Sequence, residues 1–573
     1  MIGSHRAGKT NEADKRNSYN IRQRDAILIG CFQGEFSEMG KRFGESGARA
    51  VEAVWTQEVQ PHDLTSLTRL ITRTEDDSHE STVVRSPATG EEIGSVPACT
   101  KDDVQLALKR ARKAQKKWMK LPTAQRRNII LRYHAIVLER QAELLDVLQI
   151  EAGKARRDAL EEVLDVAINC RHYAYRAESY LEPKWRKGVL PLLTTTWEFR
   201  HPVGVVGFIS PWNYPLTLTI SDAIPALLAG NAVILKPDSQ TPFAALLGVQ
   251  WLLEAGLPDG LFQILTGYGK TIGAPLIGGV DYICFTGSTE TGREIARQAG
   301  ENLIRCSLEL GGKNPMVVLD DADLGKAVQG AIRGCFANAG QLCLSFERVY
   351  LQDGIHESFL HAFIEATSNL RLGRGKDFEA EMGSLISAQQ LRKVDDHIQD
   401  AVGKGAKILT GGRARPDLGP FFYEPTILAE VTADMKVAQE ETFGPVVAVY
   451  RFQDVDQAIA MANDSPYGLN ASIWTGSVRS GREIAKRLKC GTVNINEAYA
   501  AAWGSVDAPM GGMKASGIGR RHGEEGFLKF TQAQTVSSQR FVSVGPWPGV
   551  KTELYARIMT AALRLLRHIP GLR

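Results

Sequence analysis

The chain has 573 residues, of which 43% are hydrophobic and 23% are charged, and its formal net charge at pH 7 is +3. A chain of this length can bury a large core and is expected to divide into two or three domains. Its near-neutral charge gives no reason to expect nucleic acid or a strongly acidic partner. We therefore predict a globular protein that does not bind nucleic acid.

Cysteine usage indicates the compartment. The eight cysteines are spread along the chain: Cys31, Cys99, Cys170, Cys284, Cys306, Cys335, Cys343 and Cys490. They form no C-x-x-C pair, and no histidines cluster at metal-ligand spacing, so we expect no metal site. The pattern is typical of a reducing, cytoplasmic compartment. The sequence also shows no apolar run of transmembrane length and no secretory start.

The first eighty residues carry no recognisable chemistry. Residues 1–24 are polar and of mixed charge, and we expect residues 1–80 to form a poorly ordered extension. A helix is predicted after Thr100, which forms a capping box with Asp103. Apolar residues then recur at helical spacing and are predicted to be core: Val104, Leu108, Ala111, Ala114 and Trp118.

From Val203 onward, strand-like and helix-like segments alternate. The predicted strands are 203–209, 232–235, 261–265 and 282–285, with a helix after Thr241. This alternation predicts a doubly wound α/β fold whose parallel sheet binds a dinucleotide beyond the carboxyl ends of its strands. The usual glycine fingerprint is missing, because residues 267–273 (GYGKTIG) have the wrong final spacing; we interpret them as a turn.

A phosphate site is predicted at residues 285–292 (FTGSTETG), where a strand breaks at glycine and enters a helix. Free amides at the start of a helix, together with the Ser288 hydroxyl, suit a pyrophosphate oxygen. The alternative is an ordinary helix N-cap, which serine and threonine commonly form.

Three residues suggest chemistry when they are taken together. Cys343 follows the small glycine-containing turn 336–342, Glu309 ends an upstream strand, and Asn213 follows an apolar strand. A cysteine nucleophile needs a donor for the oxyanion that it creates, and a later hydrolysis needs a base to activate water. Taken singly, each residue also has a structural interpretation, as a packed cysteine, a solvated strand end and a turn amide.

The segments around these three residues together resemble the aldehyde dehydrogenase superfamily. The resemblance covers about residues 86–540 and includes the C-terminal run 509–520 (PMGGMKASGIGR). Within the superfamily, the chain is similar to the bacterial NADP-type succinate-semialdehyde dehydrogenase branch. A catalytically silent relative that kept the fold is the alternative of another class, and retention of Asn213, Lys236, Glu309 and Cys343 argues against it.

The resemblance implies an α/β fold with a doubly wound dinucleotide-binding domain, an α/β catalytic domain and a small β element for oligomerisation. The implied boundaries are 81–178 and 198–310 for the first domain, 311–508 for the second, and 179–197 with 528–545 for the oligomerisation strands. It implies a homodimer or homotetramer.

The resemblance also implies residue roles. Cys343 attacks an aldehyde, the Asn213 amide and the Cys343 backbone N–H hold the oxyanion, and Glu309 activates water to hydrolyse the thioester. The implied contacts of the nicotinamide cofactor are Ile209, Ser210, Trp212, Lys236, Ser239, Gly287, Ser288, Gly292, Glu441 and Phe443. Because Ser239 stands where NAD-preferring relatives commonly place a glutamate, we predict NADP, with NAD as a possible second cofactor.

The first prediction for the substrate is succinate semialdehyde, and the alternative is an aromatic or medium-chain apolar aldehyde. The implied pocket is formed by Tyr214, Leu218, Ser221, Ala337, Leu342, Trp503, Ser505 and Met510, and we expect it to be roomy and largely apolar. Relatives that oxidise succinate semialdehyde clamp its carboxylate with two arginines, where this chain has Ser221 and Ala337. Other donors are then needed, and Arg171, Arg176 and Ser505 are candidates.

Residues 551–568 have apolar positions at helical spacing beside several arginines. This pattern predicts a basic amphipathic helix. Such a helix more often packs on protein than on lipid, so we expect peripheral membrane contact at most.

Overall fold

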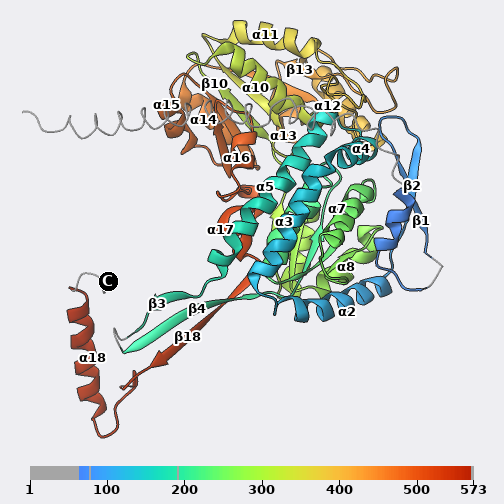
Figure 1. Cartoon of the computed structure of the whole chain (residues 1–573). Helices are drawn as coiled ribbons and strands as arrows, with labels where there is room; N and C mark the ends of the chain where they lie inside the picture. Colours follow the sequence, from blue (N-terminus) through green and yellow to red (C-terminus); the bar gives the residue numbers. More distant parts are fainter. Residues whose placement is uncertain (1–63, 76–78, 190–192, 542, 569–573) are drawn as a thin grey trace, which may run out of the picture. The chain divides into compact units, whose positions relative to one another are not determined.

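The computed structural model describes residues 64–75, 79–189, 193–541 and 543–568 (Figure 1). Most of the predicted N-terminal extension therefore lies outside the described residues. Residues 64–75 correct that prediction, because Leu67 and Ile71 of the 3-10 helix region η1 (Leu64–Leu70) are buried in the core. The Thr72 N–H also donates to the Ile264 carbonyl at 2.9 Å, which attaches this segment to the first sheet.

The first sheet has the strand order β17-β9-β8-β5-β6-β7. Its strands are β5 (Val205–Ile209), β6 (Ala232–Lys236), β7 (Phe262–Ile264), β8 (Tyr282–Thr286), β9 (Arg305–Glu309) and the short β17 (Gly517–Ile518). All pairs are parallel except β17 with β9. The chain builds β5, β6 and β7 in one direction and then continues with β8 on the other side of β5, so the predicted doubly wound α/β fold is confirmed.

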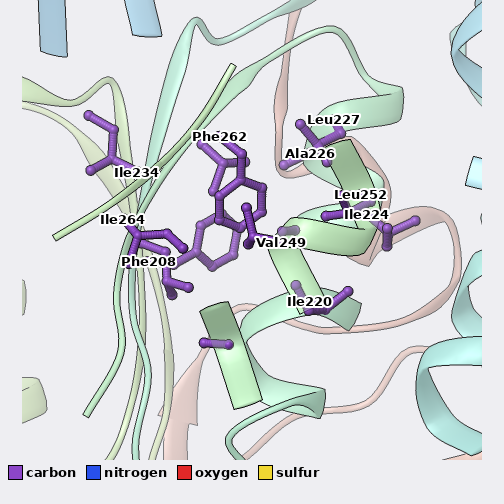
Figure 2. Packing of buried hydrophobic residues seen from close by; sticks show 14 of the residues in the cluster. Phe208, Ile220, Ile224, Ala226, Leu227, Ile234, Val249, Leu252, Phe262 and Ile264 are labelled. Carbon is purple, nitrogen blue, oxygen red and sulfur yellow. The ribbon is translucent and has the colours of Figure 1, made fainter. Parts of the chain in front are cut away.

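Helices pack on this sheet through apolar side chains (Figure 2). They are α2 (Lys101–Trp118), α3 (Thr123–Glu139), α4 (Gln141–Ala152), α5 (Arg156–Leu181), the π-helical turn η2 (Thr217–Ser221), α6 (Ala223–Leu228), α7 (Pro242–Glu254), α8 (Gly269–Gly279) and α9 (Thr289–Glu301). Thr100 caps α2 through the predicted capping box with Asp103. The interpretation of residues 267–273 as a turn was wrong beyond Tyr268, because α8 begins at Gly269.

The second sheet has the order β12-β13-β14-β11-β10-β15-β16, and only β12 runs antiparallel to its neighbour. Its strands are β10 (Asn314–Val318), β11 (Phe346–Gln352), β12 (Lys407–Thr410), β13 (Thr426–Ala429), β14 (Val446–Phe452), β15 (Asn470–Trp474) and β16 (Thr492–Ile495). The accompanying helices are α10 (Leu324–Phe336), η3 (Ala337–Gly340), α11 (His356–Ser368), α12 (Ala388–Gly403), α13 (Lys436–Gln439), α14 (Val455–Asn463), α15 (Val478–Ala485), α16 (Ala500–Gly504), η4 (Lys514–Ser516) and α17 (Gly523–Leu528).

Two smaller sheets complete the described chain. A hairpin joins β1 (Ser81–Arg85) to β2 (Glu92–Pro97), and a three-stranded antiparallel sheet has the order β18-β4-β3. The latter contains β3 (Lys184–Lys187), β4 (Thr194–Pro202) and β18 (Thr531–Gln539). Apart from Thr531, the side chains of β18 are exposed. Helix α18 (Thr552–Leu566) follows and buries none of its side chains in the described chain.

The sheets fix where a site can form. In a doubly wound sheet, ligands bind beyond the carboxyl ends of the strands at the point where the strand order reverses. Here that point lies between β5 and β8, which end at Ile209 and Thr286. Residues that follow β5, β8 and β9 are therefore brought to one edge of the first sheet.

Candidate active site

The Cys343 thiol is presented by a loop with unusual backbone conformation. Asn338, Ala339 and Gly340 have φ values of 51°, 55° and 69°, a left-handed run that two residues other than glycine rarely adopt in sequence. Glycine is required at position 340, because a Cβ atom there would lie 2.1 Å from the Gly444 carbonyl oxygen. The Asn314 amide donates to the Cys343 carbonyl at 2.7 Å and fixes the end of the loop.

Asn213 is joined directly to this loop. Its Nδ2 donates to the Gln341 carbonyl at 3.0 Å, and its own carbonyl accepts from Asn338 Nδ2 at 3.0 Å and from Lys154 Nζ at 2.8 Å. One Nδ2 hydrogen is used by Gln341, which leaves the second available for an oxyanion. The predicted amide and thiol are therefore held in one hydrogen-bonded unit.

Glu309 ends β9 and is half-buried, with unusual electrostatics. Among the described residues, its Oε1 has no hydrogen-bond partner. Burial raises the pKa of its carboxyl to about 7, although the positive charges of Arg521 and Lys529 act in the opposite direction. A carboxyl that titrates near neutral pH suits a general base.

The Cys343 thiol is strongly disfavoured as a thiolate in this environment. Burial raises its pKa to about 12, and the negative charges of Glu441 and Glu309 add to the effect, while Arg521 opposes it. Glu441 itself has its pKa raised to about 7, first by burial and then by the charge of Glu347. To act as the predicted nucleophile, the thiol would first have to give its proton to a nearby base.

Two cavities meet at Cys343 and Asn213, which line both. The first cavity, of about 180 Å³, is also lined by Pro211, Trp212, Thr286, Gly287, Ser288, Glu309, Leu310, Gly311, Gln390, Lys393, Glu441 and Phe443. The second cavity, of about 30 Å³, is also lined by Glu161, Tyr214, Thr217, Leu218, Leu342, Leu344, Tyr499, Trp503, Met510 and Arg521. The reactive thiol therefore faces two different spaces.

The first cavity contains five of the ten residues predicted to contact a cofactor: Trp212, Gly287, Ser288, Glu441 and Phe443. Trp212 and Phe443 meet edge to face, with ring centroids 5.5 Å apart. Ser288 accepts from the Thr291 N–H at 3.2 Å, so it caps α9 and lines the cavity at once. Gln390 and Lys393 of α12 were missed, because their segment carries no recognisable motif.

The other five predicted cofactor residues do not line this cavity. Ile209 ends β5, Ser210 donates to the Leu218 carbonyl at 2.7 Å, and the Lys236 Nζ donates to the Pro237 carbonyl at 3.0 Å. Gly292 lies in α9, where a Cβ atom would come within 2.5 Å of Leu310, so its role is close packing. Ser239 is half-buried in the loop after β6.

The loop after β6 also contains Asp238. Its Oδ1 accepts from the Gln240 N–H at 2.9 Å and from Gln240 Nε2 at 3.4 Å. One oxygen of this carboxylate is therefore engaged within the loop. The pKa of the buried Lys236 is lowered by desolvation, which the charge of Asp238 partly offsets.

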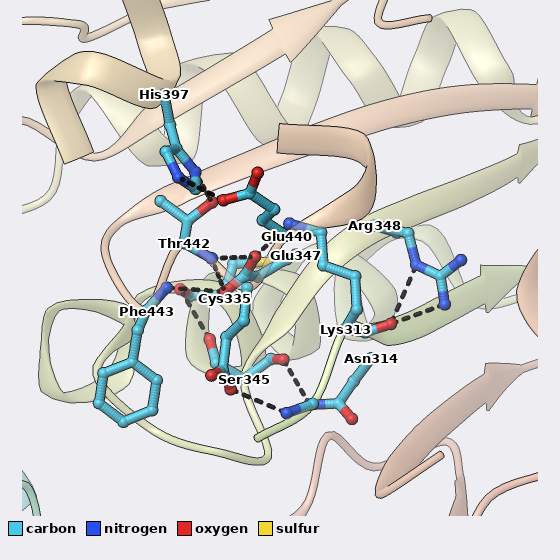
Figure 3. A network of polar contacts seen from close by, with 12 residues as sticks. Lys313, Asn314, Cys335, Ser345, Glu347, Arg348, His397, Glu440, Thr442 and Phe443 are labelled. Carbon is cyan, nitrogen blue, oxygen red and sulfur yellow. Dashed lines mark hydrogen bonds and ion pairs between the residues drawn. The ribbon is translucent and has the colours of Figure 1, made fainter. Parts of the chain in front are cut away.

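A buried polar network holds the segment that carries Glu441 and Phe443 (Figure 3). The Glu347 carboxylate accepts from the Thr442 N–H and the Phe443 N–H, each at 2.9 Å, and forms an ion pair with Lys313. Burial alone would raise the pKa of Glu347, but the charge of Lys313 and these hydrogen bonds hold it below its usual value. Because Glu441 also accepts from the Gly312 N–H at 2.8 Å, the network joins this segment to the one that follows Glu309.

The second cavity contains five of the eight predicted pocket residues: Tyr214, Leu218, Leu342, Trp503 and Met510. The other three lie elsewhere. Ser221 is buried and donates to Asp165 Oδ2 at 2.6 Å, Ala337 lines a separate cavity, and the exposed Ser505 donates to the Ala501 carbonyl at 2.6 Å. The pocket is also narrower than we expected.

Neither of the two arginines proposed as carboxylate donors lines the second cavity. Arg171 and Arg176 are exposed on α5. The arginine that does line it is Arg521, which sequence reasoning missed because it lies in a glycine-rich C-terminal segment. No helix in the described part of the chain is both long and apolar enough to cross a membrane.

Comparison with known proteins finds related sequences and structures. Residues 74–536 match the model of the Aldehyde dehydrogenase family. A Mycolicibacterium smegmatis protein named "Putative succinate-semialdehyde dehydrogenase [NADP(+)]" is 48% identical over 509 residues, or 89% of this chain and 98% of that protein. Among solved structures, an E. coli NADP-dependent enzyme is 36% identical with a TM-score of 0.78, covering 82% of this chain and 97% of that one. The NAD+ complex of a Bacillus cereus aldehyde dehydrogenase is 32% identical with a TM-score of 0.78. This match covers 84% of this chain and 99% of that one.

Proposed function

The chain belongs to the aldehyde dehydrogenase family, and we propose that it oxidises succinate semialdehyde to succinate with NADP as the preferred cofactor. The observation that supports this most is the position of the Cys343 thiol and the Asn213 amide, which line two cavities at once. One cavity can hold the cofactor and the other the aldehyde, so that both reach the same sulfur.

In the proposed mechanism, the Cys343 sulfur attacks the aldehyde carbon and the carbonyl oxygen becomes an oxyanion. The Asn213 amide and the Cys343 backbone N–H donate to this oxygen. A bound nicotinamide would supply the hydride acceptor, so that loss of hydride from the former aldehyde carbon would leave a thioester to Cys343. Glu309 then takes a proton from water, the resulting hydroxide attacks the thioester carbon, and the carboxylic acid leaves as the thiol is restored.

The thiol must first lose its proton. With a pKa of about 12, Cys343 is almost entirely protonated at neutral pH. The carboxylates that face it, Glu309 and Glu441, both titrate at about 7 and are the bases available for this proton. Their burial therefore prepares them to accept a proton that an exposed carboxylate would not hold at this pH.

The residues present fit a dinucleotide phosphate. Helix α9 starts at the switch point of the sheet, and the Ser288 hydroxyl stands at its N-terminus beside the first cavity. The Lys236 ammonium, buried at the end of β6, would hold the adenosine ribose. Ser239 leaves room for a 2′-phosphate and adds a donor, whereas a carboxylate there would repel it. NAD remains the second cofactor in this proposal.

The substrate is proposed from the relative named "Putative succinate-semialdehyde dehydrogenase [NADP(+)]". The second candidate is an apolar aldehyde, because leucine, methionine and aromatic side chains make up most of the cavity wall.

The test is to measure kcat/KM for succinate semialdehyde, butanal and benzaldehyde, each with NADP and with NAD, from the absorbance of the reduced nicotinamide. We expect succinate semialdehyde with NADP to give the largest value. A larger value for benzaldehyde would favour the second candidate. If no aldehyde produced reduced cofactor, the proposed function would be wrong.

We further propose a homodimer or homotetramer in the cytoplasm. Support for assembly comes from the exposed apolar side chains of the three-stranded sheet, such as Trp185, Trp197 and Val536. Support for the compartment comes from the seven cysteines in the described chain, which are all free thiols. Light scattering coupled to size-exclusion chromatography measures the oligomer mass.

A further inference from the structure

Arg521 is the cation of the second cavity. The described residues that line this space include one other charged side chain, Glu161, and no lysine or histidine. Arg521 is 6% exposed. It reaches this position because its backbone pairs with Met510, each N–H donating to the carbonyl of the other.

The guanidinium of Arg521 is only partly satisfied. Its Nε donates to Asp222 Oδ1 at 2.8 Å, whereas the buried Nη2 has no hydrogen-bond partner among the described residues. A guanidinium carries five N–H donors in a planar fork, which suits a carboxylate. A buried donor without a partner is costly, so such a group is a natural point for ligand recognition.

The opposite charge in the cavity is already neutralised. The Glu161 carboxylate accepts from the Tyr499 hydroxyl at 2.9 Å, from Arg333 Nη2 at 3.0 Å and from the Tyr214 hydroxyl at 3.4 Å. Its negative charge is therefore compensated by its own partners. A negative group on the substrate would be attracted to Arg521 and repelled by Glu161, so the two charges would orient a charged substrate within the narrow cavity.

Other negative groups compete for Arg521 and have to be considered. Asp222 is its direct partner, and the charges of Asp165, Glu309 and a Cys343 thiolate also act on it. Asp165 is turned to the Ser221 hydroxyl, which donates to it at 2.6 Å. Glu309 lines the first cavity rather than the second. Arg521 therefore lines the second cavity while one of its guanidinium nitrogens, Nη2, has no hydrogen-bond partner among the described residues.

We infer that Arg521 binds the carboxylate of an aldehyde substrate that carries an acid group at its far end, while the aldehyde carbon lies at Cys343. This inference rests on the proposed function and assigns the carboxylate contact to a residue other than Arg171, Arg176 or Ser505. It makes Arg521 a specificity-determining residue, whose loss weakens recognition of the acid without removing the thiol chemistry.

The experiment compares kcat/KM for succinate semialdehyde with kcat/KM for butanal, which has the same number of carbon atoms and no charge. Arg521→Met should lower the succinate semialdehyde value about 10- to 100-fold, the range expected for a lost charge-assisted hydrogen bond, mostly through KM. The butanal value should change less than about threefold, because no charged contact is lost. Arg521→Lys should give an intermediate ratio, since it keeps the charge without the fork.

Arg521→Met leaves Asp222 buried without its partner and can destabilise the fold. The double variant Arg521→Met/Asp222→Asn removes both charges and should show the same loss of preference for the acid. Arg176→Met is the matched control, because Arg176 is exposed on α5 and lies outside the cavity. It should leave the ratio unchanged.

Equal losses for both aldehydes in Arg521→Met and in the double variant would overturn the inference and indicate a structural role. A wild-type enzyme without preference for the acid, or a ratio that changes in Arg176→Met and not in Arg521→Met, would also overturn it. In each of these cases the proposed function, aldehyde oxidation through Cys343, would still be supported. If the wild-type enzyme oxidised neither aldehyde, the proposed function itself would fail, and the inference with it.

Discussion

The two cavities that meet at Cys343 differ in both size and charge. The first holds about 180 Å³ and is lined by two half-buried carboxyl groups, Glu309 and Glu441, together with Cys343. The second holds about 30 Å³, is mostly apolar, and contains one guanidinium and one carboxylate that has its own partners. Under the proposed function, the first cavity would control the protonation of the sulfur and the second would control the choice of substrate.

The largest effect is expected from removing the atom that the two cavities share. Cys343→Ala should lower kcat by at least about 10⁴-fold for every aldehyde, because no nucleophile remains. Stopped-flow measurement of reduced nicotinamide checks this. Cys335→Ala is the matched control, since Cys335 is a buried cysteine that lines neither cavity, and it should retain most of the activity. Comparable activity in the two variants would contradict the assignment of the nucleophile.

A substitution at Glu309 in the first cavity should leave the attack of Cys343 on the aldehyde intact and slow the hydrolysis of the thioester. It should therefore separate these two stages of the reaction. Glu309→Gln should lower the steady-state rate about 10²- to 10⁴-fold, because the base for hydrolysis is lost. The first turnover should still release about one equivalent of reduced cofactor per site, and mass spectrometry should detect the acylated protein.

The pH dependence of the hydrolysis step provides a further check. Because the Glu309 carboxyl has a pKa of about 7 and acts as a base, its active, deprotonated form increases as the pH rises. The rate of acyl release by the wild type should therefore rise about 10-fold between pH 6 and pH 8, and the variant should be flat over this range. Glu440→Gln, which changes an exposed carboxylate, is the control.

A change beyond the first cavity should affect only the choice of cofactor. Ser239→Glu places a carboxylate where we expect the 2′-phosphate of NADP, and should lower kcat/KM for NADP about 10- to 100-fold relative to NAD. Gln240→Glu adds the same charge one residue away and should have a smaller effect. An unchanged ratio in Ser239→Glu would place the adenosine ribose elsewhere.

The smallest expected effect concerns the reactivity of the thiol without substrate. The pKa of about 12 predicts that alkylation of Cys343 by iodoacetamide rises about 10-fold per pH unit between pH 7 and pH 10 without reaching a plateau. Glu441→Gln removes a negative neighbour, which lowers the pKa of the thiol and increases the thiolate fraction at any given pH. Alkylation should then be faster by up to about 10-fold, measured by mass spectrometry of the peptide containing Cys343. A slower alkylation in Glu441→Gln would contradict the conclusion that the charge of Glu441 raises the pKa of the Cys343 thiol.

The sequence predicted the elements that local pattern determines. The four strands β5 to β8 of the first sheet, the capping box at Thr100 and the start of α9 follow from alternation, helical spacing and capping chemistry. The predicted catalytic residues Cys343, Glu309 and Asn213 each lie in a recognisable local segment, and the structure brings them to one cavity. The short turn before α8 was misjudged at Gly269, because glycine spacing alone does not separate a turn from a helix start.

The tertiary structure decided what fills each cavity. Ser221 and Ala337 lie in predicted pocket segments, yet one bonds to Asp165 and the other lines a different space, since the direction of a side chain depends on its helix and its neighbours. Arg521 enters the second cavity through a backbone pairing with Met510 and a buried bond to Asp222, which is 299 residues away along the chain. Contacts between residues so distant in sequence leave no local periodicity. The sequence by itself therefore determined the fold and the candidate reacting groups, while only the tertiary structure decided which charged side chains line the second cavity.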